Sequence, residues 1–422
     1  MLKAKSTKPL GGYLAPIVHR RPAGHHLQFS RSRSSRCADT DPCRLHDHED
    51  RAARGDRPAD GNRSSAFLKE KNYLLAGRKV ELYTVDTAAT PAVAKSKLQE
   101  LIQRDKVHVV LGPLAAFEAL AIDDQIREAK LPIISTSAAA EDLTQRNINP
   151  WFVRATSSSA QPSHPLGEYA AKVLGYKRMV IFADDFAYSQ EVSSGFQRVF
   201  EDNGGKIVQK IWTPINATDY APYLSQIKPD VDGIFLGSAG SNSLRFLRQR
   251  AEYGLKIPIV GAQTVSDEAI LRNMGDEALG VITTRWYSAT IDTPANKKFV
   301  ADYVKANGYE PGTFSAGGYS GGVFLEQGLI DAKGDIENKE QFMRHLRTMK
   351  IAGDPRGPLR FDEYGNPIET MFITKVERVG GKLVNSVVAT YPETSQFWTY
   401  DPKDFLSKPV YSRNSPPARY LE

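Results

Sequence analysis

The sequence predicts an α/β protein of two lobes, each a doubly wound parallel sheet, with a ligand site between them. Two observations predict this fold class. From Ala66 onward, short apolar strands alternate with helical patterns, which is typical of βαβ units whose sheets are covered on both faces. The strands also fall into two groups, one ending near residue 150 and the other running from about 178 to 265.

The first group opens with the end of an amphipathic helix, a turn at Gly77 and an alternating strand over 79–85. The next helix is predicted over 91–106, because Pro91 suits a first-turn position. The strand 107–113, the helix 115–130, the strand 132–138 and the extended segment 150–159 complete the group.

The second group continues the same alternation. Strands are expected over 178–185, 206–214, 231–240 and 258–265, and helices over 164–176, 188–205, 219–228 and 242–254. A return segment over 280–289 leads to helices over 293–309, 313–334 and 338–350. Residues 358–391 end the body as a hairpin-like β stretch, with turns at "EYGN" and "GG".

These elements suggest boundaries between parts of the chain. Lobe one is expected to comprise 66–155 and 285–352, and lobe two 156–284 and 353–392, with a C-terminal tail over 393–422. Because open α/β sheets bind ligands at the carboxyl ends of their strands, we expect a ligand between the two lobes.

Charge is distributed unevenly along the 422 residues. The formal net charge is +6, and residues 1–65 alone carry 13 Lys and Arg against 7 Asp and Glu, so the remaining chain is balanced. This balance argues against nucleic acid or anionic lipid as a partner. With 41% hydrophobic residues and no apolar run near the ~20 residues of a membrane span, the chain is expected to be soluble and globular.

The first 65 residues also hold both cysteines. Cys37, Cys43, His46 and His48 supply four possible metal ligands, but the spacing C-x5-C-x2-H-x-H differs from that of structural zinc sites. The flanking residues have no apolar periodicity that would hold a tetrahedral shell. We therefore expect no metal site there, and a disordered segment is the plainer interpretation.

Enzyme motifs are missing as well. The sequence has no G-x-S-x-G elbow, no P-loop, no H-E-x-x-H, and no G-x-G-x-x-G after a strand. The glycine-rich "AGGYSGG" at 316–322 lies within a predicted helix, where close helix packing explains it better than phosphate binding. We therefore predict that the protein is not an enzyme and holds no cofactor.

From about Ala66 to Tyr391 the chain resembles the periplasmic substrate-binding proteins of ABC transporters, in the branch of the leucine/isoleucine/valine-binding proteins. The matching stretches include "VLGPLAA", "LPIISTSAA", "NPWFVRATSSS", "GLKIPIVGAQ", "PANKKFVADYVKANGYEP" and "GPLRFDEYGNP". The resemblance implies the type I periplasmic binding fold with a multi-strand hinge, a monomer that delivers a small-molecule ligand to permease subunits, and a periplasmic location.

The resemblance also makes the first 65 residues anomalous. Family members begin with a strand that would be central in lobe one, and here an Arg/His/Asp-rich stretch takes its place. We hypothesise that residues 1–65 are a frame-shifted or wrongly started reading, or else a disordered extension. A missing central strand would leave two strand edges unpaired and a poorly soluble product. No signal peptide is legible at the amino terminus either.

Site residues follow from the resemblance, position by position. In lobe one, Ala115, Ala116 and Phe117 stand where serines are usual, and Ser135, Ser137, Ala138 and Ala139 form the second loop that would hold a ligand carboxylate. In lobe two, Tyr188 matches a tyrosine that closes over the ligand, with Gly237 and Ser238 after the next strand. Gln263 stands where a carboxylate usually holds the ligand's ammonium.

A neutral Gln263 predicts a ligand with an acid group and no amine, because an amide gives an ammonium a weaker bond than a carboxylate does. Trp286 and Tyr287 could stack on a ring, and Arg285 could clamp a carboxylate. The C-terminal tail resembles those of aromatic-acid binders, so an aromatic or hydrophobic carboxylate is the favoured cargo.

Other interpretations stay open. The cargo could be a branched-chain or other hydrophobic amino acid, or the chain could be the ligand-sensing subunit of an amide- or urea-type regulatory or uptake system. Among the site residues, Gln263 could simply satisfy backbone groups, Trp286 and Tyr287 could be packing residues, and Arg285 could form an ion pair on the surface.

Overall fold

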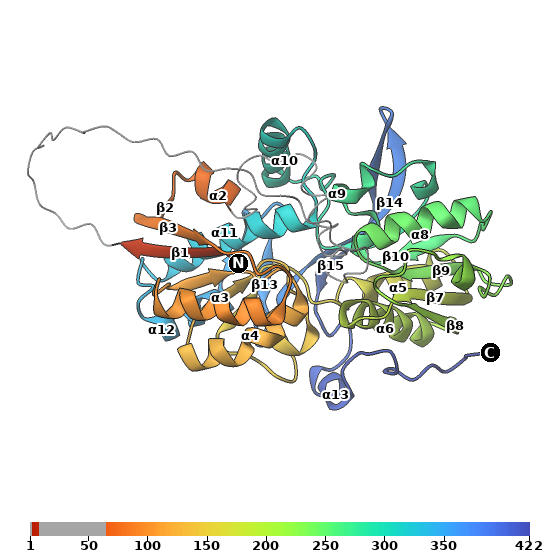
Figure 1. Ribbon diagram of the computed structural model, residues 1–422, viewed down its shortest axis with the longest axis horizontal. Helices are drawn as coiled ribbons and strands as arrows, with labels where there is room; N and C mark the ends of the chain where they lie inside the picture. The colour runs from red at the N-terminus through yellow and green to blue at the C-terminus, as the bar shows by residue number, and fades with distance from the viewer. Residues whose placement is uncertain (1, 8–64) are drawn as a thin grey trace, which may run out of the picture.

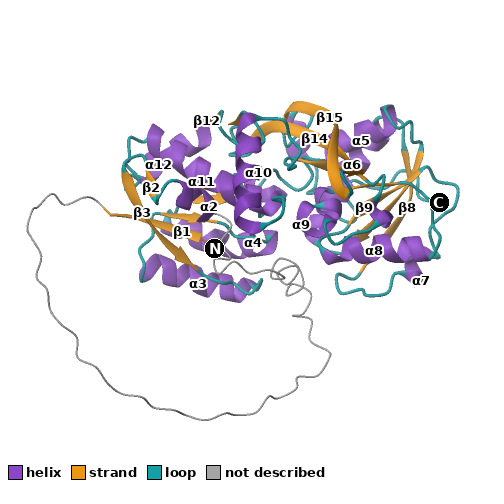
Figure 2. Cartoon of the chain, turned by 90° about the horizontal axis from the view of Figure 1, so that it is seen from above, coloured by secondary structure: helices purple, strands orange, loops and turns teal. Residues whose placement is uncertain are grey.

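The computed structural model describes residues 2–7 and 65–422 and shows two lobes side by side (Figures 1 and 2). Each lobe is a β-sheet covered by helices, and each sheet contains a run of parallel strands, β4 to β6 in one and β7 to β11 in the other. The predicted fold class, two parallel-sheet α/β lobes, is confirmed. No helix in the described ranges combines the length and apolar character needed to cross a membrane.

Lobe one contains a six-stranded sheet in the order β2-β3-β1-β4-β5-β6. The strands are β1 (Leu2–Thr7), β2 (Leu74–Leu75), β3 (Arg78–Thr84), β4 (Val109–Leu111), β5 (Ile133–Ser135) and β6 (Phe152–Arg154). Strands β4, β5 and β6 are parallel neighbours, so the loops that follow them meet at one edge of the sheet.

Strand β1 lies between β3 and β4 and runs antiparallel to both. Its six residues pair with β3 from Leu2 opposite Thr84 to Thr7 opposite Lys79. The expectation that this position in the sheet would be empty is therefore wrong, because residues 2–7 fill it. Residues 8–64, including the cysteine and histidine stretch, lie outside the described residues, so the frame-shift hypothesis stays a prediction.

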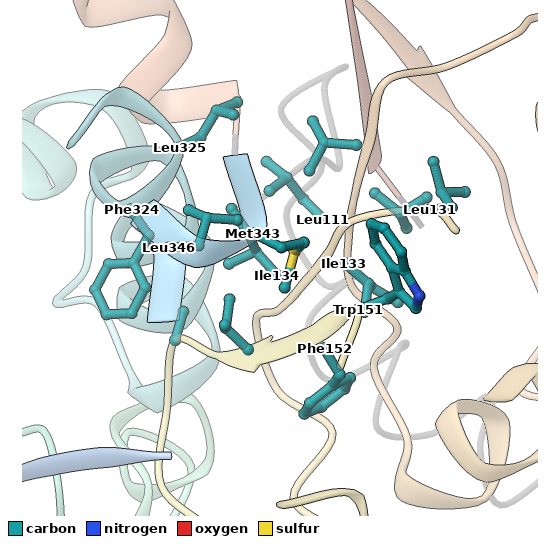
Figure 3. Packing of buried hydrophobic residues seen from close by; sticks show 14 of the residues in the cluster. Leu111, Leu131, Ile133, Ile134, Trp151, Phe152, Phe324, Leu325, Met343 and Leu346 are labelled. Atoms are coloured by element: carbon teal, nitrogen blue, oxygen red, sulfur yellow. The ribbon is translucent and has the colours of Figure 1, made fainter. Parts of the chain in front are cut away.

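Helices cover the lobe-one sheet and enclose its core. They are α2 (Ser65–Glu70), α3 (Pro91–Gln103), α4 (Ala116–Ala129), α10 (Pro294–Asn307), α11 (Thr313–Asp331) and α12 (Lys339–Thr348), with the short η1 (Glu141–Thr144). Buried side chains from the strands, such as Ile133 and Phe152, pack together with Phe324 and Leu346 from α11 and α12 (Figure 3). Residues far apart in the sequence thus form one core.

The glycines of "AGGYSGG" lie within α11, as predicted. A Cβ at Gly317 would lie 2.2 Å from the carbonyl oxygen of Thr136, and one at Gly322 would lie 2.6 Å from the Phe67 ring. Both distances are too short for a carbon atom. The glycines therefore serve the close packing of α11 against β5 and α2.

The second sheet has nine strands in the order β12-β13-β14-β11-β10-β9-β7-β8, with β15 on β14, and forms lobe two except for β12 and β13, which pack into the lobe-one core through Ile351 and Leu359. Its strands are β7 (Arg178–Asp184), β8 (Lys206–Thr213), β9 (Gly233–Gly237), β10 (Ile259–Gly261), β11 (Ile282–Arg285), β12 (Lys350–Ile351), β13 (Leu359–Phe361), β14 (Pro367–Val379) and β15 (Lys382–Thr394). The strands from β7 to β11 are parallel, whereas β14 joins them antiparallel and forms the predicted hairpin with β15.

The helices of lobe two are α5 (Ser163–Lys172), α6 (Ala187–Asp202), α7 (Ala221–Leu224), α8 (Ser241–Glu252) and α9 (Glu268–Leu271), with η2 (Gln263–Ser266) and η3 (Asp276–Ala278). The helix predicted over 219–228 is reduced to the four residues of α7. Beyond α7 the chain continues in tighter turns, in which the N–H groups of Gln226 and Ile227 donate to the carbonyl oxygens three residues earlier, and Pro229 disfavours the helical conformation at Lys228.

The chain passes between the lobes after β6, after β11 and again before β14. Arg356 holds these three crossings together. Its guanidinium group donates to Asp354 at 2.8 Å, to Glu369 at 2.6 Å and to the carbonyl oxygen of Ala155 at 2.5 Å. It also lies 4.5 Å from the Trp286 ring. The hinge therefore has a buried ionic centre as well as packed side chains.

The C-terminal segment, with α13 (Pro402–Ser407), contacts both lobes. Phe397, Phe405 and Tyr411 pack on Ala160 in the first crossing. Arg146 of lobe one donates to backbone carbonyls at the end of α13, including that of Lys408 at 2.9 Å. The segment beyond residue 393 is thus part of the folded body.

Candidate functional site

Two loops of lobe one lie together at the carboxyl edge of its sheet. Strands β4 and β5 pair in parallel, and the backbone N–H of Ala138 donates to the carbonyl oxygen of Pro113 at 3.4 Å. Ser135 is fully buried, and its hydroxyl donates to the carbonyl oxygen of Ala138 at 3.0 Å. Ser135 and Ala138 therefore support the loop, while Ser137 and Ala115 are half-buried beside it.

The amino terminus of α4 already has a carboxylate of its own. The backbone N–H of Ala115 donates to Oε2 of Glu118 at 3.0 Å. The Glu118 side chain is only 1% exposed, and its Oε1 has no hydrogen-bond partner among the described residues. A ligand carboxylate at Ala115, Ala116 and Phe117 would therefore compete with the Glu118 side chain for the N–H of Ala115.

Glu118 was missed by the sequence reasoning, although a signal existed. A Glu three residues after a helix N-cap is the usual acidic member of a capping box, which accepts from the N-cap backbone N–H. The same side chain lies on the buried face of α4 with Ile122 and Ile126. A glutamate that caps α4 and also lies on its buried face could thus have been predicted to place a carboxylate at the candidate site.

In lobe two, three strand ends come together around Thr264. The Tyr188 hydroxyl, in the first turn of α6, lies 3.4 Å from the Thr264 hydroxyl, which donates to the carbonyl oxygen of Ser238 at 2.7 Å. Gln263 precedes Thr264 at the start of η2. Tyr188, Ser238 and Gln263 therefore lie around Thr264, and these four residues are called the lobe-two wall of the candidate site.

Gly237 has a packing role in this wall. A Cβ there would lie 2.7 Å from the Ser193 hydroxyl oxygen and 2.9 Å from the Ala183 Cβ. Only a glycine lets β9 approach α6 and β7 this closely.

Asp184 supports the same wall from the end of β7. Its carboxylate accepts from the backbone N–H of Ala239 at 3.1 Å and from the Thr213 hydroxyl at 3.3 Å. Burial raises the pKa of Asp184 to about 6, against the lowering effect of these hydrogen bonds. Both carboxyl oxygens are engaged by the protein, so Asp184 shapes the loop after β9.

Arg285, Trp286 and Tyr287 are buried and have partners within the protein. Arg285 is fully buried and donates to Thr283 at 2.7 Å, to Ser266 at 2.8 Å and to Glu268 at 3.3 Å. Trp286 and Tyr287 are buried in a hydrophobic cluster at the hinge. Arg285 is ion-paired inside the protein, not on its surface, and the two aromatic residues have the packing role that the sequence left open.

The lobe-one loops and the lobe-two wall are connected through the start of α11. The backbone N–H of Thr313 donates to Asp267 of lobe two at 2.8 Å, and one turn later Gly317 approaches Thr136 of lobe one. A Cβ at Gly317 would also lie 3.1 Å from Cγ2 of Thr156 in the first crossing. The lobe-one loops, the first crossing and lobe two therefore meet at this helix end.

A small cavity of about 160 Å³ lies elsewhere on lobe one. It is lined by Lys106, Val107, His108, Lys339 and three apolar neighbours. Val107 and His108 precede β4, so the cavity is at the amino edge of the sheet, opposite the loops described above. It does not belong to the candidate site.

The part of the chain with this architecture, residues 66–382, matches the family model for periplasmic binding proteins. The chain belongs to the periplasmic binding protein family. Among the described residues of this periplasmic binding protein, no group of three or more His, Cys, Asp or Glu side chains could hold a metal ion. Cys37, Cys43, His46 and His48 lie outside the described residues.

Known relatives fit this family. The Leu/Ile/Val-binding protein homolog 6 of Brucella melitensis is 26% identical over 336 residues, which cover 77% of this chain and 85% of the relative. A solved ABC transporter substrate-binding protein from Sphaerobacter thermophilus is 31% identical, with a TM-score of 0.76 and coverage of 84% and 96%. A solute-binding protein from Rhodopseudomonas palustris BisB5, solved with 3,4-dihydroxybenzoic acid, is 32% identical, with a TM-score of 0.74 and coverage of 83% and 94%.

Proposed function

We propose that this periplasmic binding protein is the solute-binding component of an ABC importer and captures a small aromatic or hydrophobic carboxylate between its lobes. It acts in the periplasm as a monomer and passes the ligand, chemically unchanged, to the permease subunits. The solved relative that holds 3,4-dihydroxybenzoic acid supports this ligand class.

The observation that carries the proposal is the neutral side chain of Gln263 in the wall of lobe two. Gln263 stands at the strand end next to Thr264, and its amide oxygen is buried without a partner among the described residues. An unpaired buried acceptor favours a ligand group that donates a hydrogen bond, such as a ring hydroxyl. A ligand ammonium would lack the carboxylate partner that a dry site requires.

Hydroxyl groups at the first crossing provide donors for the ligand carboxylate. The hydroxyls of Thr156 and Ser157 are buried and have no partner in the described part of the chain. Thr156 lies beside Gly317, where the walls of the two lobes meet. We propose that these hydroxyls, with Ser137, bind the carboxylate in place of the serines that the first lobe-one loop lacks.

Closure about the three crossings completes the site in this proposal. The ligand binds one lobe first, and contacts with the second lobe then favour the closed arrangement. Tyr188, at the amino end of α6, closes over the ligand from lobe two. The closed form is the one that the permease recognises.

A thermal-shift screen of the full chain tests the proposal. Benzoate, 4-hydroxybenzoate and 3,4-dihydroxybenzoate are compared with leucine, isoleucine and valine at equal concentrations. A ligand present at a hundred times its Kd stabilises the folded state by about 2.7 kcal/mol, which raises Tm measurably. We expect a rise with an aromatic acid alone. A rise with none of the six would refute this ligand class.

Glu118 favours a second candidate, a hydrophobic amino acid. Its buried carboxylate has one oxygen without a partner among the described residues, so it could hold a ligand ammonium that Gln263 cannot. The similarity to the Leu/Ile/Val-binding protein homolog 6 supports this alternative.

The substitution Glu118→Gln separates the two candidates. The glutamine keeps the hydrogen bond to the Ala115 N–H and removes the charge. If the ligand is an amino acid, we expect its Kd to rise about tenfold or more, because a charge-assisted bond is lost. If it is a carboxylate without an amine, its Kd should fall or stay unchanged. Isothermal titration calorimetry measures both, and Glu128→Gln, exposed on the same helix, is the control.

A further inference from the structure

The C-terminal segment is attached to lobe one by a single guanidinium group at the end of α13 (Figure 1). Arg146 of η1 donates to the carbonyl oxygens of Phe405 at 3.2 Å, Lys408 at 2.9 Å and Pro409 at 3.3 Å. The last carbonyls of a helix lack partners within it, so a cation placed there stabilises them. Asp142 pairs with the same guanidinium at 3.3 Å and holds it on lobe one.

The same segment is attached to lobe two along α6 and the first strands of the sheet. The Tyr400 hydroxyl donates to Asp202 of α6 at 2.7 Å, and Arg419 pairs with the same carboxylate at 3.0 Å. The last residue, Glu422, pairs with Arg178 of β7 at 2.7 Å. Because these attachments extend from Tyr400 to the end of the chain, the segment is expected to move with lobe two.

The ring of Phe405 lies between two arginines, one from each lobe. Arg146 of lobe one is 5.9 Å from the centre of this ring, and Arg198 of α6 in lobe two is 4.9 Å from it. Phe405 is only 2% exposed and packs on Ala160 in the first crossing. Rotation of one lobe against the other therefore displaces this ring from one of the two guanidinium groups.

We propose that residues 395–422 act as a strap that limits rotation of the lobes, with Arg146 as its release point. Since the strap follows lobe two, rotation that moves η1 away from α6 breaks the hydrogen bonds of Arg146. Gln396 also binds lobe one, through the carbonyl oxygen of Thr144 at 2.9 Å and Asp362 at 2.7 Å. That attachment lies at the third crossing, where rotation displaces the chain least.

The consequence is a contact that favours the arrangement described here in the absence of ligand. Its strength sets how often the lobes visit rotated arrangements, and hence the apparent affinity for any ligand that prefers one arrangement. The strap does not depend on which ligand the protein binds.

Double electron–electron resonance of the full chain without ligand tests the proposal. Spin labels are attached at Glu128→Cys on α4 and Glu252→Cys on α8, both exposed, after Cys37→Ser and Cys43→Ser. In this labelled protein, Arg146→Ala should raise the ratio of rotated to described arrangements about tenfold, the equivalent of one charge-assisted hydrogen bond. The distribution of distances between the labels should therefore shift or gain a second population.

Two further variants show whether the lobe-one contact is responsible. Arg419→Ala is the matched control, because it removes an arginine from the same strap but only a contact with lobe two, at Asp202. Its distance distribution should equal that of the labelled parent. Arg146→Lys keeps the charge but reaches fewer carbonyls, so it should change the distribution in the same direction as Arg146→Ala and by less.

A melting curve of each variant shows that it is folded. Distributions of Arg146→Ala and Arg146→Lys that equal that of the labelled parent would overturn the proposal. An equal change in Arg146→Ala and Arg419→Ala would overturn it as well, because the effect would then come from general loosening of the segment.

Discussion

At the scale of single residues, the main feature of the candidate site is the distribution of charged and neutral side chains. Lobe two presents Gln263 at a strand end, and lobe one presents the carboxylate of Glu118 at the start of α4. Arg285, the cation first considered for the ligand, is bound to Glu268 and two hydroxyl groups. Under the proposed function, the choice between an acid and an amino acid depends on these two side chains, which differ by one negative charge.

Gln263→Glu should change this choice. A carboxylate beside Thr264 would repel an aromatic acid and attract an ammonium group, so we expect about a tenfold or greater rise in Kd for the acid. Leucine should bind more tightly to the variant than to the wild type. Titration calorimetry with both ligands measures the change. Gln226→Glu, on the surface of lobe two, should leave both affinities unchanged.

At the scale of elements, α11 positions the site. Its first turn contacts lobe two through Asp267, and its glycines allow contact with β5 and α2. The helix therefore determines the distance between the lobe-one loops and the first crossing. Its glycines are needed for contact between backbones, because any side chain would push the helix away from the sheet.

Gly317→Ala should destabilise the protein by about 1–3 kcal/mol, as overpacking of a tight interior does. The added carbon would lie 2.2 Å from the carbonyl oxygen of Thr136, a backbone atom that cannot rotate away as the end of a flexible side chain can. Chemical denaturation measures the loss. Gly353→Ala, where a Cβ meets nothing within 4 Å, is the control and should change stability little. Equal stability of the two variants would contradict this account of α11.

At the scale of the whole molecule, buried acids connect the lobes. Arg356 binds Asp354 and Glu369 at the third crossing and reaches back to the first. Burial raises the pKa of Glu369 to about 7 despite the opposing effect of Arg356. Burial likewise raises the pKa of Asp362 to about 6. The hinge region therefore binds protons more tightly when folded than when unfolded.

Stability should consequently fall as the pH rises from about 4.5 to about 7. A carboxyl group whose pKa is raised by folding stabilises the protein fully below its ordinary pKa, and this contribution is lost as the pH passes the raised value. For Glu369 the loss is on the order of 3 kcal/mol. Denaturant unfolding of Glu369→Gln at several pH values should show a smaller fall than in the wild type. Parallel curves for the two proteins would refute the role of Glu369.

The sequence alone determined most of the architecture and the family. Apolar strands alternating with helices predict parallel α/β lobes, because the apolar period of each segment follows from the faces it buries. The order of short motifs identified the family, and the strand-end loops placed Tyr188, Ser238 and Gln263 in a predicted site whose role in ligand binding stays a prediction. These are local properties, readable from residues close together in the chain.

Contacts between distant segments were decided only by the tertiary structure. Strand β1 fills a position that the sequence left empty, and Arg285 finds its partner Glu268 through the packing of η2 on β11. Such pairs have no periodicity in the sequence, because burial and pKa arise only when both lobes exclude water from the same space.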